Sequence, residues 1–522
     1  MGAEPGVRGA GALSVRRALL VCLVVALGPS GAGAGAHTTP AMLVELARPP
    51  DAATAHELRA AGAALVERDL RIWRLPGPAT ALLPRLAVRR LEPDRVLRPL
   101  AAGAPATVAP ASEWWLRAIG AGKLDAPGPG KPVTVVDTGI DAGHPEFAGH
   151  DIQLLNRQDG IDLPGDYHGT AVSSLVSATG VRVVGVYPRA VLREWDATRD
   201  GQLSLSAIIE GVDAAIRAGP GVINLSLGGP IDDRMLRDAI LDAAHEGSLV
   251  VAAQGEDRFD GSPPAYPADD PKVLAVVATD RHNAVYIDSN GSESNDLSAP
   301  GVGVDVAVPA SASPSGYRTV TGNSFAAPIV SAAAAWIWTR RPSLTPAQLY
   351  GLLVGTARRI SNGPYNTVSG YGLLNLRAGL TAPVPPASPF EPNDDIAMVE
   401  PGRLFSSGEP LLTSPVRRRA FVRGGLYQNE NPRDVYRVWI PARGRVSATA
   451  TPLTGQIQLR AWRPGTRTVL EGGADRLRDT LAAAAPGDDR LELSNPTGHG
   501  MVAYVEVSIG SSQTASYSLA LR

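Results

Sequence analysis

The central half of the chain alternates between short apolar runs and helical patterns. The apolar runs are bounded by turn residues and lie at residues 133–136, 182–186, 191–195, 221–225, 248–253 and 273–277. Nearly continuous apolar runs of this length are typical of parallel strands that are covered on both faces. Helical patterns lie between them at residues 204–218 and 233–245. Residues 113–380 are therefore predicted to form a doubly wound α/β domain, with functional residues beyond the carboxyl ends of its strands.

The segment before this domain has the pattern of a small α+β unit. Strand-like runs at residues 42–46, 70–75 and 90–96 are separated by helical patterns at 53–63 and 80–87. Roughly sixty residues can form a marginally stable domain when helices cover one face of a small sheet. The following Ala-rich tract contains Pro and Gly and has no periodicity, which predicts an exposed, cleavable linker at residues 101–112.

The segment after the α/β domain has a third pattern. Residues 381–390 are rich in Pro and predict a linker. Short alternating runs separated by Gly, Pro and Asn then follow, at residues 434–440, 445–451, 456–462, 501–509 and 516–521. Alternation of this kind predicts that residues 391–522 form a β-sandwich.

Residues 1–36 have the features of a cleavable export signal. Arg16 and Arg17 precede the apolar run 18–27, and a Gly/Ala stretch ends at residue 36. About ten apolar residues are too few for a stable membrane anchor, although an uncleaved anchor is the alternative. The arginine pair leaves the export route open. Cys22, the only cysteine, lies in this segment, so we expect a secreted or cell-envelope protein without thiols or disulfides.

Charge excludes one class of partner. The 522 residues include 49 Lys and Arg and 51 Asp and Glu, and the formal net charge is −2. The charges are dispersed, and the sequence has no Lys/Arg-rich block that could bind a phosphate backbone. Nucleic acid is therefore not expected as a partner, and we expect a monomer.

A candidate nucleophile stands at the start of the longest apolar helical pattern. Ser324 follows Gly322 and Asn323 and precedes an Ala-rich run that ends at Trp338. Unpaired backbone N–H groups and the helix dipole favour negative charge at such a position. Pro328 is tolerated there because the first turn of a helix needs no donor at that residue. An ordinary N-cap serine is the structural alternative.

Two further polar residues stand at the boundaries of expected elements. Asp137 ends the apolar run 133–136, and His168 opens a helical pattern. Taken alone, the first could be a turn former and the second a surface residue. A serine nucleophile, however, needs an imidazole to take its proton and a carboxylate to hold that imidazole in the right tautomer. Together, Asp137, His168 and Ser324 predict nucleophilic catalysis.

These motifs, in the order Asp, His, Ser, resemble those of the subtilisin-like serine proteases, over residues 113–380. The resemblance implies that Ser324 attacks, that His168 is general base and then acid, and that Asp137 orients His168. It also implies two strands that bind an extended peptide, formed by Ser226, Leu227 and Gly228 and by Ala253, Gln254 and Gly255. A segment at residues 266–268 is similar to one with a cis proline, so the Tyr266–Pro267 bond is expected to be cis.

The resemblance extends to the flanks. Residues 37–100 resemble the family's N-terminal propeptide, a ferredoxin-like α+β domain that acts as an intramolecular inhibitor until it is cut. A permanent accessory domain is the alternative. Residues 391–522, which begin with Glu391, Pro392, Asn393 and Asp394, are similar to a C-terminal prepeptidase domain.

Glu256 departs from the family pattern. The family places an asparagine after Gly255 to donate a hydrogen bond to the oxyanion, and here that position holds Glu256. An ionised carboxylate has no donor and repels the developing charge, whereas a protonated carboxyl group donates. The first case predicts an impaired protease that binds peptides, and the second predicts activity that is favoured at low pH. Alternatively, Glu256 faces solvent and another group such as Gln254 donates.

No cofactor is expected, and calcium has no clear motif. The loop 178–183 is about two residues shorter than in calcium-binding relatives and lacks their asparagine. Asp394 and Asp395 could bind calcium, but solvated loop acids are the better interpretation. The sequence thus predicts a secreted, propeptide-activated serine endopeptidase acting on extended peptides, with a catalytically impaired peptide-binding protein as the alternative.

Overall fold

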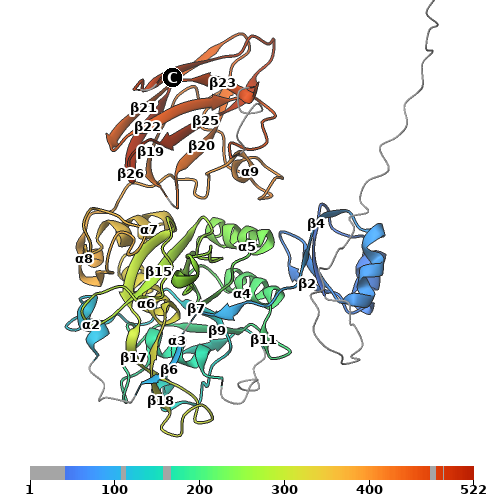
Figure 1. The fold of residues 1–522 in the computed structure, drawn as a ribbon. Coiled ribbons are helices and arrows are strands. Elements are labelled where there is room, and N and C mark those ends of the chain that lie inside the picture. The colour runs from blue at the N-terminus through green and yellow to red at the C-terminus, as the bar shows by residue number, and fades with distance from the viewer. Residues whose placement is uncertain are drawn as a thin grey trace, which may run out of the picture. The chain divides into compact units, whose positions relative to one another are not determined.

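The computed structural model describes residues 41–100, 102–106, 113–156, 166–428, 430–470, 478–485 and 487–522. The expected export segment, residues 1–36, lies outside the described residues. The described elements form three modules, which we define as an N-terminal module (residues 41–100), a central module (113–382) and a C-terminal module (391–522) (Figure 1). Among the described residues, helices long and apolar enough to cross a membrane are absent.

The central module is built on a parallel sheet of seven strands. In spatial order these are β16 (Asn295–Pro300), β15 (Val273–Thr279), β14 (Leu249–Ala253), β12 (Val222–Leu225), β7 (Val133–Asp137), β9 (Leu192–Asp196) and β8 (Ile152–Leu154). Four long helices flank it, namely α3 (His168–Ser177), α4 (Leu205–Arg217), α5 (Arg234–His245) and α6 (Asn323–Arg340) (Figure 1). This confirms the expected doubly wound α/β fold.

Strand β7 shows why the apolar runs are continuous. Val133 and Val135 belong to the hydrophobic cluster that includes the buried residues of α3 and α6. Val136 belongs to the cluster that includes those of α4 and α5. Successive side chains of a strand point to opposite faces, so a sheet that is covered on both faces needs apolar residues at every position.

Smaller elements complete the central module. They are α2 (Trp114–Ala118), the 3-10 helices Pro145–Phe147 and Arg258–Asp260, β10 (Thr198–Arg199), β11 (Gln202–Leu203), β13 (Leu227–Gly228), β17 (Val302–Ala307), β18 (Tyr317–Thr321), α7 (Pro346–Gly355) and α8 (Leu376–Thr381). The Tyr266–Pro267 bond is cis, as expected.

The prediction of a strand at residues 182–186 is wrong. This segment is a loop, and the backbone N–H groups of Gly180, Val181, Arg182 and Val183 all donate to the carboxylate of Glu146. Glu146 is fully buried. The apolar residues here are buried although the backbone forms a loop around the carboxylate of Glu146. Apolar patterning cannot distinguish such a loop from a strand.

The N-terminal module has one antiparallel sheet in the order β2 (Ala64–Glu67), β3 (Ile72–Leu75), β1 (Met42–Leu46) and β4 (Val88–Pro93). The helix α1 (Ala52–Ala60) is shorter than expected, because β2 begins within four residues of its end. The second expected helix is a 3-10 helix (Gly77–Arg85) that contains Pro84. Leu43, Val66 and Ile72 share a buried cluster with residues of α4 and α5, so this sheet packs on the central module.

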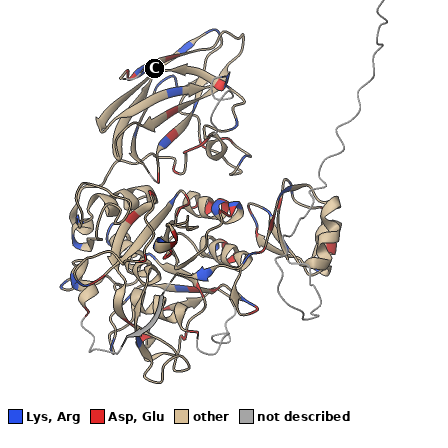
Figure 2. Ribbon diagram, in the orientation of Figure 1, with Lys and Arg blue, Asp and Glu red and all other residues tan. Residues whose placement is uncertain are grey.

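The C-terminal module consists of two antiparallel sheets around a shared apolar core. One contains β19 (Ala420–Tyr427), β26 (Thr514–Leu521), β21 (Arg445–Thr454) and β24 (Arg490–Ser494), and the other contains β20 (Arg433–Ile440), β25 (Met501–Ile509), β22 (Ile457–Trp462) and β23 (Thr480–Ala483). A short helix, α9 (Ile396–Val399), precedes them. Basic and acidic residues are interspersed over all three modules (Figure 2).

Candidate active site

Asp137 and His168 lie in direct contact. Asp137 is the last residue of β7, and its carboxylate is completely buried. Its Oδ1 accepts a hydrogen bond from the Thr138 N–H and lies 2.7 Å from Nδ1 of His168, the first residue of α3. With Nδ1 carrying the proton toward Asp137, the neutral imidazole presents Nε2 as an acceptor. Among the described residues, Nε2 has no hydrogen-bond partner.

Two acids set the charge state of this imidazole. Burial lowers the pKa of His168, but the carboxylates of Asp137 and Asp166 outweigh burial and raise the pKa above its ordinary value. The Asp166 Oδ1 also accepts hydrogen bonds from the His168 N–H and the Thr138 hydroxyl, both at 3.1 Å. Sequence reasoning missed Asp166, although its spacing two residues before His168 is typical of an acid that accepts from a helix N-terminus.

Ser324 lies at the N-terminus of α6 and is fully buried. Its hydroxyl donates to the backbone carbonyl of Ser226 at 2.8 Å and is not hydrogen-bonded to His168. The ring of Phe325, the next residue, lies 5.6 Å from the His168 ring centroid. The structure therefore brings the three predicted residues to one edge of the sheet, with Asp137 and His168 paired and the Ser324 hydroxyl hydrogen-bonded to the Ser226 carbonyl.

The chain's own residues 95–100 occupy the predicted peptide-binding strand. Strand β5 (Arg98–Pro99) pairs antiparallel with Leu227 and Gly228 of β13. On its other side, the Leu97 N–H donates to the Leu203 carbonyl at 2.9 Å, and the Leu205 N–H donates to the Arg95 carbonyl at 2.8 Å. The sequence did not predict that residues 203–205 pair with residues 95–97, because nothing local marks residues 203–205 as an exposed strand edge.

Leu100 is the residue that reaches the candidate nucleophile. Its carbonyl oxygen accepts a hydrogen bond from the Ser324 N–H at 2.9 Å. Its side chain is buried and lies against Gly228, where an added Cβ would come within 2.9 Å of the Leu100 Cδ1. Gly228 thus leaves the space that the side chain of Leu100 fills. Beyond this point, β6 (Ala102–Ala106) pairs antiparallel with β18.

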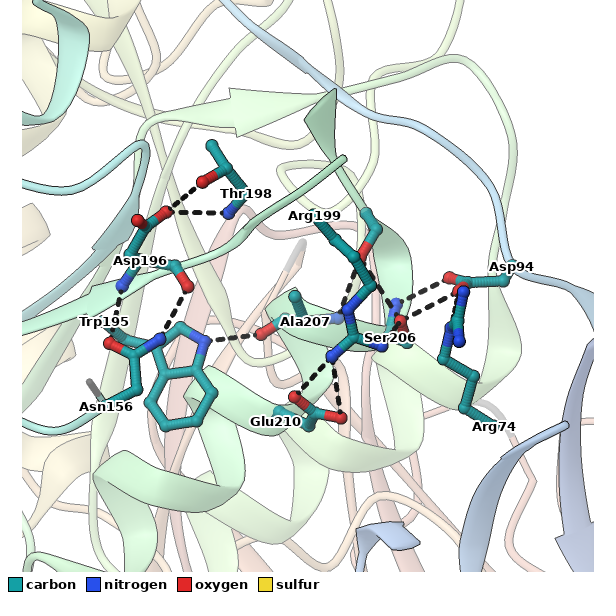
Figure 3. A network of polar contacts seen from close by, with 11 residues as sticks. Arg74, Asp94, Asn156, Trp195, Asp196, Thr198, Arg199, Ser206, Ala207 and Glu210 are labelled. Atoms are coloured by element: carbon teal, nitrogen blue, oxygen red, sulfur yellow. Dashed lines mark hydrogen bonds and ion pairs between the residues drawn. The ribbon is translucent and has the colours of Figure 1, made fainter. Parts of the chain in front are cut away.

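A polar network links Asp94 of the N-terminal module to the start of α4 (Figure 3). The Asp94 carboxylate accepts hydrogen bonds from the Ser206 N–H and hydroxyl, both at 2.9 Å, and pairs with Arg74 at 2.6 Å. Ser206 is in the first turn of α4, so Asp94 caps a helix of another module. Arg199 pairs with Glu210 on the next turn of α4.

The other predicted peptide-binding strand, residues 253–255, begins at the end of β14. Ala253 is its last residue, and the Gln254 side chain points into the protein. The Gln254 amide donates to Asp269 at 3.1 Å and to Asn295 at 2.9 Å, so this side chain is engaged away from Ser324. At Gly255 an added Cβ would come within 2.5 Å of the Asn290 amide nitrogen, so this segment needs glycine there.

Glu256 lies beside the amide that contacts Leu100. Its side chain is half-buried, and its Oε1 accepts a hydrogen bond from the Asn323 N–H. Because Asn323 precedes Ser324, the carboxyl group of Glu256 lies at the N-terminus of α6. This position is the one at which a carboxyl group affects the charge that develops on a carbonyl oxygen held by Ser324.

The expected loop acids are not solvated. Asp394 and Asp395 are both buried, which corrects the interpretation from the sequence. Asp394 pairs with Lys272 at 2.9 Å, and Asp395 accepts from the Val469 N–H at 2.7 Å. Within the described residues, groups of three or more acids and histidines close enough to share a metal ion are found only around Asp242, and these groups exclude Asp394 and Asp395.

Comparison with known proteins identifies what the chain resembles. Residues 128–374 match the model of the subtilase family. Subtilisin from Bacillus pumilus is 33% identical over 262 residues, which cover 47% of this chain and 89% of that protein. Subtilisin BL from Lederbergia lenta is 34% identical, and the match covers 91% of it. Subtilisin E from Bacillus subtilis (strain 168) is also 34% identical, but the chain covers only 64% of its length.

A solved structure extends the likeness in fold. Fervidolysin from Fervidobacterium pennivorans, described as a keratinolytic enzyme related to subtilisin, aligns with a TM-score of 0.57. The alignment covers 88% of this chain and 85% of fervidolysin at 19% sequence identity. At this identity the similarity concerns the fold.

Proposed function

The chain belongs to the subtilase family of serine endopeptidases, and on this premise we propose that it hydrolyses peptide bonds through an acyl-enzyme intermediate. The observation that supports the proposal best is the Leu100 carbonyl on the Ser324 N–H, because a carbonyl held by a helix N-terminal amide is in position for nucleophilic attack. The Asp137–His168 contact supplies the base.

Each proposed residue has one role. After rotation about χ1, the Ser324 hydroxyl attacks the carbonyl carbon while His168 Nε2 takes its proton. Asp137 holds the proton on Nδ1 and stabilises the imidazolium that forms. His168 then gives the proton to the leaving amine, and a water molecule repeats the sequence on the acyl-enzyme. The Ser324 N–H stabilises the oxyanion in both steps.

The first substrate in this proposal is the chain itself. The bond after Leu100 is the bond that follows the carbonyl at Ser324, so we assign it as the maturation site. Residues 37–100 then act as a propeptide, and residues 95–100 block the cleft after the cut as its inhibitor. Residues 1–36 act as the export signal of a secreted protein, and residues 391–522 as a prepeptidase domain on a monomer.

Glu256 sets the proposed pH dependence. Protonated, its carboxyl group can donate to the oxyanion, while ionised it can only repel. His168 imposes the opposite demand, because its raised pKa means that a higher pH is needed to free Nε2 as a base. We therefore expect a narrow pH optimum, bounded below by His168 and above by Glu256.

The test is labelling of the full chain with a fluorophosphonate between pH 4 and 8, after the chain has been allowed to mature. Ser324 should be labelled, and a Ser324→Ala chain should not. Glu256→Asn should raise turnover near neutral pH by on the order of 10²- to 10³-fold if the carboxylate limits the oxyanion site. Absence of labelling at every pH would contradict the enzyme proposal.

The second candidate is a peptide-binding protein with little or no activity. It is favoured by the Ser324 hydroxyl, which donates to Ser226 and not to His168, and by the acid at the oxyanion position. This candidate predicts that matured chains, if any form, bind peptides without cleaving them. Fluorophosphonate labelling of the parent chain separates the two candidates, because the second candidate predicts that Ser324 reacts little or not at all while Glu256 is present.

A further inference from the structure

An ion pair joins the bound residues 95–100 to the segment that carries Glu256. The Arg98 guanidinium lies 2.6 Å from the Asp257 carboxylate. Leu100 contributes the carbonyl at Ser324, so Pro99 and Arg98 are the second and third residues before the bond to be cut. An incoming peptide that pairs with β13 in the same register places its third residue at Asp257.

The backbone around Asp257 fixes this carboxylate at the rim. The Asp257 N–H donates to the Asn290 side-chain oxygen at 2.7 Å, and its carbonyl accepts from the Asp260 N–H at 3.0 Å and the Ser262 N–H at 3.2 Å. A backbone anchored at both its donor and its acceptor keeps its place when residues 95–100 leave. The backbone that carries the Asp257 carboxylate is thus preformed.

Charge near this rim favours a cation. Glu256 precedes Asp257, Asp260 follows in the 3-10 helix, and Asp288 accepts a hydrogen bond from the Arg258 N–H through its backbone. Arg258 is the basic residue within this stretch. The excess of carboxylates adds attraction for a basic side chain and repulsion for an acidic one.

We propose that Asp257 is a specificity-determining residue that selects Arg or Lys at the third position before the cleaved bond. The proposal rests on the proposed endopeptidase function, and its substrate class is extended peptides that carry a basic residue there. The Arg98 side chain is 61% exposed and that of Asp257 is 31% exposed, so the selection is modest. Exposed pairs of this kind change affinity by up to about fivefold, and charge reversal by about tenfold.

The first test uses the matured full chain and two peptides with the sequence of residues 95–106, one natural and one with Glu in place of Arg98. The ratio of kcat/KM should be about tenfold in favour of the natural peptide at low salt, and it should fall toward one in about 1 M NaCl. Asp257→Asn should bring this ratio of kcat/KM values close to one. Asp260→Asn is the matched control, since it removes the same charge from an exposed neighbour.

Equal kcat/KM values for the two peptides, or a ratio that survives Asp257→Asn, would overturn the proposal. Failure to cleave either peptide would contradict the endopeptidase function instead, and a second measurement then decides the recognition without turnover. In Ser324→Ala chains, Arg98→Glu should speed amide hydrogen exchange of Leu97 by about tenfold. Asp257→Arg should restore its protection, and Asp260→Arg should not; no change with Arg98→Glu overturns the proposal.

Discussion

The central module meets its two neighbours through contacts of contrasting charge. Toward the N-terminal module, the carboxylate of Glu67 faces the carboxylate of Asp242, and both side chains are buried. Toward the C-terminal module, the Lys272 ammonium lies 2.9 to 3.6 Å from carboxylates of Glu391, Asp394 and Glu430. At Glu67 the first contact brings two acids together, and at Lys272 the second contact places a cation among three acids.

Two acids at the N-terminal contact have raised pKa values. Burial raises the pKa of Glu67 to about 7, and Asp213 and Asp69 add to the shift, while hydrogen bonds from the Asp69 and Leu70 N–H groups oppose it. Burial likewise raises the pKa of Asp242 to about 7, and Glu67, Asp69, Glu246 and Asp213 add to it. Neighbouring cations pair with other acids of this contact, as Arg90 does with Asp238 and Arg217 with Asp213.

The lysine at the C-terminal contact stays charged. Burial lowers the pKa of Lys272, but Asp394, Glu391 and Glu430 outweigh burial and hold the pKa well above its ordinary value. Burial raises the pKa of Glu430 to about 8, against the opposing effect of Lys272. The two contacts should therefore respond differently to pH. Rising pH should weaken the N-terminal contact, whereas the C-terminal contact keeps its cation at every physiological pH.

The largest effect is expected from Lys272→Met. Removing the cation leaves three acids buried without a partner of opposite charge, which typically destabilises by about 3–5 kcal/mol. The C-terminal module should become sensitive to limited proteolysis, and the thermal unfolding temperature should fall. Arg445→Met is the control, because the Arg445–Glu492 pair is mostly exposed and should contribute little. Equal effects of the two substitutions would contradict the role of Lys272 in stabilising the C-terminal contact.

The next largest effect concerns pH. A buried acid with a raised pKa binds its proton more tightly in the closed state, so the contact loses stability as pH rises from about 4.5 to about 7. In Ser324→Ala chains, exchange of the Leu205 amide, corrected for its intrinsic rate, should speed by on the order of tenfold to a hundredfold over this window. Glu67→Gln should flatten the dependence, and the exposed Glu57→Gln should not. A flat profile for the parent chain would contradict the contrast.

A smaller effect is expected from Asp94→Ala. This substitution removes the cap that the N-terminal module supplies to α4, at a cost of about 1 kcal/mol, or roughly a fivefold faster exchange of the Leu205 amide. Asp51→Ala, which removes a cap within the N-terminal module itself, is the matched control. An equal change in both variants would mean that the cap across the contact is unimportant.

The smallest effect is expected from calcium. Glu67, Asp69 and Asp242 lie close enough to share a cation, but the raised pKa values of Glu67 and Asp242 favour protons over a metal ion at this contact. Addition of calcium or of a chelator at pH 5.5 should therefore leave the exchange of the Leu205 amide nearly unchanged. Strong protection by calcium would show that a metal ion balances the charge of these acids. That result would contradict the proposed difference between the N-terminal and C-terminal contacts.

The sequence predicted the features that depend on local pattern. The run 133–136 is readable as a strand because both faces of β7 are buried, and Asp137 is found because it ends that run. Loop 182–186 was mispredicted as a strand because its apolar residues are buried, although its N–H groups bind the carboxylate of Glu146. Apolar patterning reports burial and not which backbone groups are paired.

Contacts between distant segments were not predictable. Residue 100 and residue 324 are joined by one backbone hydrogen bond, and neither position carries a local signal of the other. Asp394 looked like a solvated acid because its partner, Lys272, belongs to another module. Likewise, the side chain of Glu256 could be placed near the oxyanion only by resemblance, while its bond to the Asn323 N–H required coordinates.

The most direct test is the N-terminal residue of the first product of cleavage beyond the proposed export signal, residues 1–36, determined by mass spectrometry during maturation of the full chain. We expect cleavage after Leu100, so that this product begins at Ala101, and we expect Ser324→Ala chains to stay uncut beyond residue 36. A first product that begins elsewhere, or cleavage after Leu100 in purified Ser324→Ala chains, would contradict the assignment of Ser324 as nucleophile for the carbonyl that it holds.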